Sequence, residues 1–132
     1  MSVPCEVAVK CVLPVVRAMI AKELTTEYQL KQREVAELLA VSQPAISLYY
    51  RKIRGRAIDL ESDRDIRGLV ENVAKSLAER KPSRRDLILM YCEICRTIRA
   101  KGLLCKLHKA FDPAIDIDSC ALCFTSNSIR CV

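Results

Sequence analysis

The chain has 132 residues, a formal net charge of +6 and a pI near 9.0. This length suits one domain, or one small domain with an appendage, and the positive charge suits a polyanionic partner. The apolar stretch from Val12 to Ala21 contains Arg17 and is too short to span a membrane, and no secretory leader is visible, so we expect a cytoplasmic protein without a membrane anchor.

Helix-forming residues dominate the composition, glycine is scarce, and no stretch alternates apolar and polar residues with the period of a strand. We therefore predict an all-α fold. A first helix is expected over residues 13–24, with Pro14 in its first turn or at a kink. Cys5 and Cys11 show no metal-binding spacing and are expected to be small core residues.

Residues 32–50, QREVAELLAVSQPAISLYY, have the pattern of two short helices joined by a tight turn. The first helix has an inward apolar stripe of Val35, Ala36 and Leu39. Ser42 is expected to cap the second helix, because its hydroxyl can accept a free amide of the first turn. Pro44 falls within that turn, where its missing N–H costs little.

This pattern resembles the helix-turn-helix of lambda-repressor-like (XRE-type) regulators. The matching positions are Gln32 at the opening, Ala36 at the small crossing position, Val41-Ser42 in the turn and Ile46 inside. Ala40 departs from the family pattern, which usually has glycine there, and a left-handed conformation costs alanine about 1 kcal/mol. The alternative is an ordinary helical hairpin.

Basic residues follow the second helix directly. The run Arg51-Lys52-Ile53-Arg54-Gly55-Arg56 carries four positive charges and no acid, and such charges can meet DNA phosphates. The alternative is a solvated helix end whose charges complement the helix dipole. The side chains expected at double-stranded DNA are Gln32, Ser42, Gln43, Ala45, Ser47, Tyr50, Arg51, Lys52, Arg54 and Arg56.

The next helix is expected to begin at a capping box, Ser62 to Asp65, and to carry a narrow apolar stripe. The stripe consists of Ile66, Leu69, Val70, Val73 and Leu77. It either closes the core or forms the seam of a homodimer, which paired DNA half-sites would require. Arg80-Lys81-Pro82 ends this helix, so we predict a DNA-binding domain over residues 1–81 and a cysteine-rich module over residues 82–132.

A further helix is expected from a cap at Ser83 to a stop at Gly102. Its inward residues are expected to be Leu87, Ile88, Tyr91, Ile94 and Ile98. The module holds two C-x-x-C pairs, Cys92/Cys95 and Cys120/Cys123, with Cys105 and His108 between them. Since helix positions i and i+3 share a face, each pair can offer two thiolates to one metal centre. The alternative is thiols packed in a hairpin without metal.

An iron–sulfur cluster is favoured over zinc, because neither pair has the glycine of a zinc knuckle and the module holds more thiols than a Cys₄ zinc site needs. The whole chain resembles a group of small archaeal XRE-type regulators. The matching features are the opening Pro4-Cys5-Glu6, the helix-turn-helix, and then C-x-x-C, Gly-Leu-Leu-Cys-x-Leu-His and C-x-x-C in that order. This resemblance implies a transcriptional regulator with Cys92, Cys95, Cys105, Cys120 and Cys123 as candidate ligands.

We therefore expect a sequence-specific DNA-binding regulator whose cysteine module senses redox or iron state. The first alternative keeps DNA binding and makes the metal a structural zinc. A thiol redox enzyme is disfavoured because Cys92 lies deep within a predicted helix, and His108 has no nucleophile partner, so neither an enzyme nor a small-molecule substrate is expected. A protein-interaction adaptor is a third alternative. The sequence assigns no role to Cys131 or His108.

Overall fold

The computed structural model describes residues 3–52, 58–116, 118 and 120. Its helices are α1 (Pro4–Val7), a π-helical turn (Ala8–Val12), α2 (Leu13–Thr26), α3 (Gln32–Leu39), α4 (Gln43–Tyr50), α5 (Arg64–Glu79), α6 (Arg84–Ala100) and α7 (Cys105–Phe111). Within these described ranges no strand occurs, which confirms the all-α prediction. None of the helices described is both long and apolar enough to cross a membrane.

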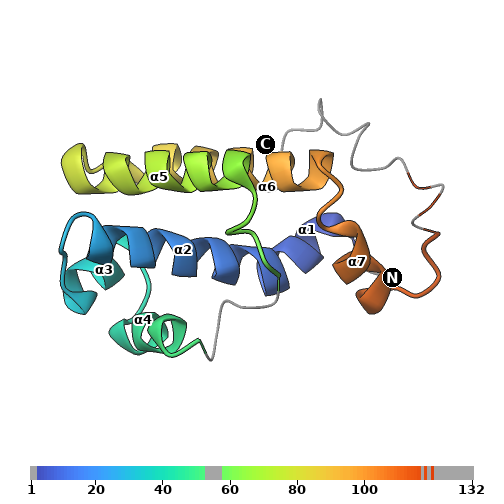
Figure 1. The fold of residues 1–132 in the computed structure, drawn as a ribbon, viewed down its shortest axis with the longest axis horizontal. Coiled ribbons are helices and arrows are strands. Elements are labelled where there is room, and N and C mark those ends of the chain that lie inside the picture. The colour runs from blue at the N-terminus through green and yellow to red at the C-terminus, as the bar shows by residue number, and fades with distance from the viewer. Residues whose placement is uncertain (1–2, 53–57, 117, 119, 121–132) are drawn as a thin grey trace.

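Helix α2 lies at the centre of the molecule (Figure 1). The antiparallel pair α5 and α6 covers one side of α2, α3 and α4 lie on the other, and α7 packs beside α1 at one end. One hydrophobic core joins these layers, and it contains residues from both sides of Pro82, such as Ile20, Ile46, Ile66 and Ile98. The core is therefore continuous across Pro82, and the division into two domains stays a prediction.

The N-terminal helix begins at Pro4, well before the expected start. Pro14 has no N–H to donate and its ring would crowd the carbonyl one turn earlier. The wider π-helical turn just before it relieves this conflict, because the N–H of Leu13 donates to the carbonyl of Ala8, five residues back. Cys11 is buried as predicted, whereas the same prediction for Cys5 is wrong: Cys5 is exposed, since its neighbour Pro4 takes the inward position.

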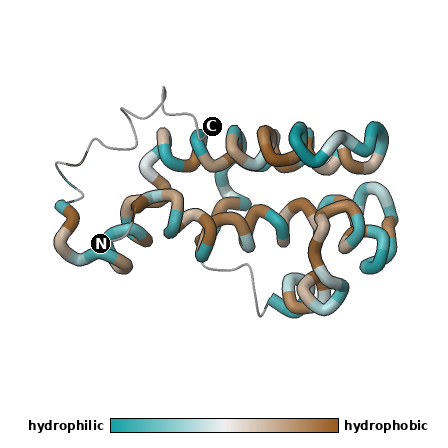
Figure 2. Tube along the Cα trace, turned by 180° about the vertical axis from the view of Figure 1, so that it is seen from behind, coloured by the Kyte–Doolittle hydropathy of each residue, from teal (hydrophilic) through white to brown (hydrophobic). Residues whose placement is uncertain are grey.

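The apolar stripe of α5 closes the core. Four of its residues, Ile66, Val70, Val73 and Leu77, are at most 3% exposed, and the stripe packs on α2 and α6. Hydrophobic and hydrophilic stretches accordingly alternate along the helices in Figure 2. Of the two roles predicted for this stripe, the structure therefore supports core closure, and a homodimer would have to use another surface.

The start of α5 is tied to the end of α6. Asp63, one residue later than predicted, is the N-cap of α5, and its Oδ1 accepts the N–H groups of Asp65 at 3.0 Å and Ile66 at 3.1 Å. Lys101 Nζ lies 3.2 Å from both Asp63 oxygens and 2.6 Å from Asp65 Oδ2. The Ile66 N–H and then the Lys101 ammonium lower the pKa of Asp63.

Both predicted ends of α6 are confirmed. The Ser83 hydroxyl accepts the N–H of Asp86 at 3.2 Å, and Gly102 ends the helix with φ of 72°. The N–H of Leu103 donates to Ile98 and that of Gly102 to Arg99, which satisfies two carbonyls of the last turn. The inward assignment of Ile88 is wrong: it is 52% exposed, because the neighbouring Leu87 occupies the core-facing position.

Candidate functional site

The turn between α3 and α4 has the geometry that a glycine would favour. Ala40 follows α3 with φ of 55° and ψ of 42°, the left-handed conformation. The N–H of Val41 donates to the carbonyl of Ala36 at 3.0 Å, so the bend satisfies the end of α3. Ser42 then caps α4 as predicted, its Oγ accepting the N–H of Ala45 at 3.2 Å.

The inner side of α4 is fixed to α2. Ile46 is fully buried and Tyr49 is 6% exposed, and both belong to the core. The Tyr50 hydroxyl donates to the carbonyl of Ala21 at 3.3 Å and is hydrogen-bonded to the Thr25 hydroxyl. These contacts hold one face of α4 against α2 and leave the opposite face to solvent.

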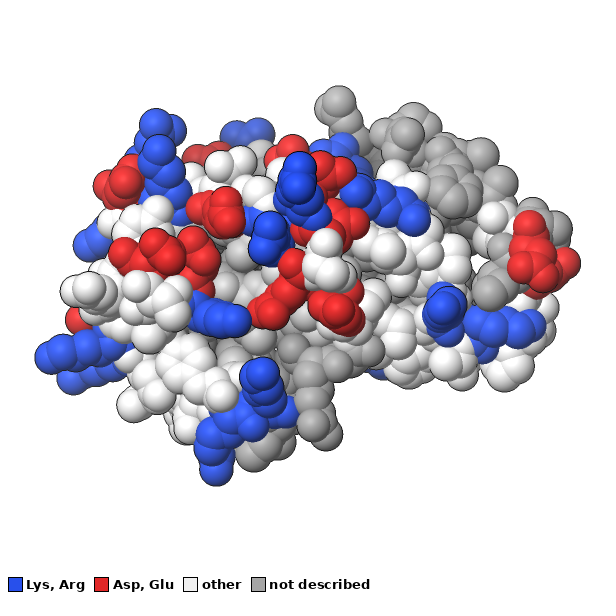
Figure 3. Space-filling view, in the orientation of Figure 1, with Lys and Arg blue, Asp and Glu red and all other residues white. Residues whose placement is uncertain are grey.

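The outer side of α4 forms a shallow hollow of about 410 Å³ with the start of α3, here called the α4 hollow. Its lining residues are Gln32, Gln43, Pro44, Ser47, Leu48 and Arg51. Amide, hydroxyl and guanidinium groups therefore meet on one surface, and none of the described lining residues is acidic. In Figure 3 the lobe where Figure 1 places α4 shows Lys and Arg without Asp or Glu, whereas the centre of that face mixes both signs.

Four of the ten predicted DNA-contacting residues thus lie together: Gln32, Gln43, Ser47 and Arg51. The structure places four others differently. Ala45 is buried, the Tyr50 hydroxyl is bonded to α2, the Ser42 hydroxyl serves as a cap, and Lys52 lines a separate cavity. Arg54 and Arg56 lie outside the described residues. Pro44 and Leu48 also line the hollow and were not predicted from the sequence, although positions 44, 47, 48 and 51 follow the spacing of one helix face.

The described members of the predicted metal-ligand set lie on α6, on α7 and after α7. Cys92 and Cys95 are half-buried on α6, Cys105 is half-buried at the first residue of α7, and Cys120 is half-buried near the end of the described chain. Cys123 falls outside the described residues. In the part of the chain that is described, no three His, Cys, Asp or Glu side chains come close enough to hold a metal ion. The described members of the predicted ligand set are therefore not assembled into a metal site.

Helix α6 makes contacts that relate its cysteines to the rest of the fold. Arg99, one turn after Cys95, has its Nη1 4.0 Å from Cys5 Sγ on α1. Tyr91, next to Cys92, has the Arg17 guanidinium of α2 5.8 Å from its ring centroid. Burial raises the pKa of Tyr91, and the Arg17 charge partly opposes this. No sequence pattern could have indicated the Cys5 contact, which spans 94 positions.

Helix α7 has one buried side chain and one cation–π contact with the N-terminal helix. His108 of α7 is only 5% exposed, and the Lys10 ammonium lies 5.7 Å from the ring centroid of Phe111.

Comparison with other proteins adds no relative, because no family model, curated protein or solved structure matches this chain.

Proposed function

We propose that this chain is a sequence-specific DNA-binding transcriptional regulator and that a cysteine-bound iron–sulfur cluster controls it in response to redox or iron state. The α4 hollow is the observation that carries the DNA-binding part. It presents Gln43 at the start of α4, Ser47 in the middle and Arg51 after the end, with Gln32 of α3 alongside. Glutamine can bond adenine through two hydrogen bonds, and arginine can pair with a phosphate or with guanine.

The dimensions of α4 are compatible with the DNA major groove. Helix α4 has eight residues, and an α-helix with its side chains is about 10–12 Å across, which fits a groove about 12 Å wide. A helix of this length reads only a few base pairs, so useful specificity requires two copies. We therefore propose a homodimer on a pseudo-palindromic site, with half-sites about one helical turn apart. Sedimentation showing a monomer alone, bound to DNA at 1:1, would contradict the homodimer.

The test of DNA binding begins with selection of bound sequences from random DNA, followed by anisotropy titrations on selected and random duplexes at several salt concentrations. Gln43→Ala is expected to lose about 1–3 kcal/mol on selected DNA and little on random DNA. Arg51→Ala is expected to weaken both and to flatten the salt slope by about 0.9. Lys75→Ala is the matched control, since Lys75 is exposed on α5, across α2 from α4.

Equal losses for Gln43→Ala on selected and random DNA would refute base recognition by α4. A weak, salt-insensitive titration of the unaltered protein would favour the protein-interaction adaptor instead.

Support for the cluster comes from the chemistry and placement of the thiols. Cys92 and Cys95 lie three residues apart on α6, so they can share a helix face, and both are half-buried, within reach of an incoming ion. Thiolate pairs suit iron–sulfur clusters and zinc. Two further ligands would come from Cys105, Cys120 and Cys123, and a cluster would supply a redox-active centre. A structural zinc is the second candidate function for the module.

Metal content separates these two candidates. Protein purified without oxygen is expected to be brown, with broad visible absorption, and to contain iron and sulfide. Cys95→Ser and Cys123→Ser are expected to remove the colour, whereas Cys11→Ser, at a buried thiol before α2, should keep it. Colourless protein with one equivalent of zinc would support the structural zinc site.

A further inference from the structure

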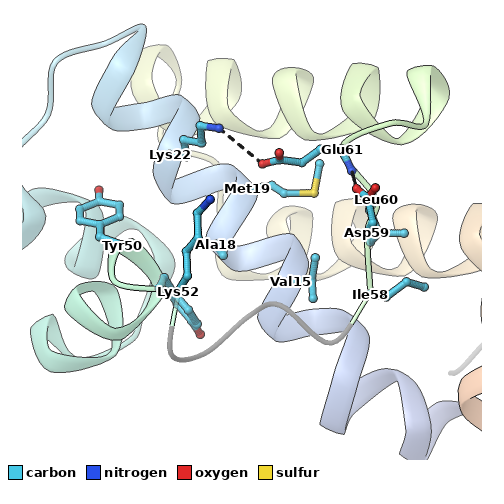
Figure 4. A pocket seen from close by; sticks show the side chains of 11 residues that line it. Val15, Ala18, Met19, Lys22, Tyr50, Lys52, Ile58, Asp59, Leu60 and Glu61 are labelled. Atoms are coloured by element: carbon cyan, nitrogen blue, oxygen red, sulfur yellow. Dashed lines mark hydrogen bonds and ion pairs between the residues drawn. The ribbon is translucent and has the colours of Figure 1, made fainter.

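A second cavity lies between α2 and α4 and is here called the α2–α4 cavity (Figure 4). Its volume is about 430 Å³, within the range typical of small-molecule sites. Apolar side chains from α2 and from residues 58–60 line much of it: Val15, Ala18, Met19, Ile58 and Leu60. The end of α4 forms another wall through Tyr49 and Tyr50. The cavity thus offers an apolar surface beside the helix proposed to bind DNA.

Most polar groups around this cavity already have partners. Asp59 Oδ1 accepts the N–H of Glu61 at 3.1 Å, and its Oδ2 accepts the Ser62 hydroxyl at 3.4 Å. Glu61 Oε1 lies 3.6 Å from Lys22 Nζ, the pair joined by a dashed line in Figure 4. The two acids and one of the two lysines are therefore engaged with the protein itself.

Lys52 is the remaining charged group. It follows α4 with φ of 56°, and its N–H donates to the carbonyl of Tyr49 at 3.1 Å. At this left-handed turn, consecutive side chains lie on opposite sides of α4: Arg51 lines the α4 hollow, whereas Lys52 lines the α2–α4 cavity. Within the described residues, no acid forms an ion pair with Lys52. The cavity consequently combines an apolar surface with one cation that no described acid pairs with.

We propose that the α2–α4 cavity binds a small carboxylic acid with an apolar body. The carboxylate pairs with the Lys52 ammonium, and the body lies against Ala18, Met19 and Leu60. A neighbouring hollow of about 320 Å³ beyond Lys22 and Glu61 is lined mainly by charged side chains, so the apolar body is confined to the first cavity. This proposal goes beyond the proposed function and does not depend on it, because binding can be measured without DNA.

The methionines provide a direct probe of binding. The chain has three, of which Met19 lines the cavity and Met90 lies on α6, outside the lining. Full-length protein with ¹³C-labelled methionine methyl groups is titrated with hexanoate, and methyl NMR shifts are followed. Hexanoate is expected to shift the Met19 signal saturably, with a Kd on the order of 1 mM, and to leave Met90 unchanged. Acetate, which lacks the apolar body, and hexanamide, which lacks the charge, are each expected to bind at least tenfold more weakly.

Variants locate the two halves of the site. Lys52→Gln is expected to weaken hexanoate at least tenfold, and Ala18→Leu, which fills the cavity, to abolish the Met19 shift. Lys75→Gln on α5 removes the same charge elsewhere and is expected to bind normally. Thermal melts confirm that each variant is folded. The proposal is overturned if Met19 shows no saturable shift up to about 20 mM hexanoate, if hexanamide binds equally well, or if Lys52→Gln binds as the unaltered protein does.

Discussion

Replacing Ala40 by glycine should stabilise the protein. Ala40 has φ of 55° between α3 and α4, and the left-handed region costs an L-residue about 1–2 kcal/mol. Glycine does not have that cost, but it loses more conformational freedom on folding, which reduces the gain in stability by about 0.4–1 kcal/mol. The net gain is therefore expected to be about 0.5–1 kcal/mol, or roughly 2–4 °C in Tm for a domain of this size. Ala40→Val should instead destabilise, because a branched side chain fits this region worse than alanine.

Urea denaturation followed by circular dichroism measures this effect. Ala18→Gly is the matched control, since Ala18 lies within right-handed α2 and glycine there is expected to cost about 1 kcal/mol. The two Ala→Gly substitutions should therefore change the free energy of unfolding in opposite directions. If Ala40→Gly destabilises the protein as Ala18→Gly does, the turn between α3 and α4 does not adopt the left-handed conformation in solution.

Two further predictions concern the contacts that position the helices. The pKa of Asp63 is lowered in the folded protein, so its stabilising effect is complete above the unfolded pKa and is lost as the pH falls through the folded pKa. Acid melts below about pH 4 should therefore show a smaller loss of stability in Asp63→Asn, which keeps a capping side chain without the charge. Tyr50→Phe removes the hydroxyl bonded to Ala21 and Thr25 and should cost about 0.5–1.5 kcal/mol. Tyr28→Phe, at a half-buried tyrosine that packs against the core, is its control, and equal losses in the two variants would refute a specific role for the Tyr50 hydroxyl.

Local patterns predicted most of the helices correctly. The caps at Ser42 and Ser83 and the stop at Gly102 depend on residues within one turn, and the structure confirms all three. The N-cap of α5 was predicted one residue too early, because two neighbouring residues have similar capping energies. Ser62 and Asp63 are both good caps, and Asp63 is favoured because Lys101, from the far end of α6, pairs with it.

The candidate site depends more on tertiary contacts, which local patterns do not contain. The outward positions of α4 followed from helix periodicity, and the structure places Gln43, Ser47 and Arg51 in one hollow. The contact between Arg99 and Cys5 depends on how α1 packs against α6. The cavity that Lys52 lines depends on how α2 packs against α4. The metal ligands remain a prediction from spacing, because the described residues do not assemble them.

The central claim, that the cysteine module controls DNA binding by α4, is tested most directly by one paired titration. Selected DNA is titrated with anaerobic protein before and after removal of the metal by a chelator, while the visible absorption is recorded. We predict that the DNA affinity changes at least fivefold as the colour is lost. A fivefold change is the lower end of the range typical of coupling between two sites. Unchanged affinity after complete bleaching, or a colourless zinc protein with the same affinity before and after air exposure, would contradict the claim.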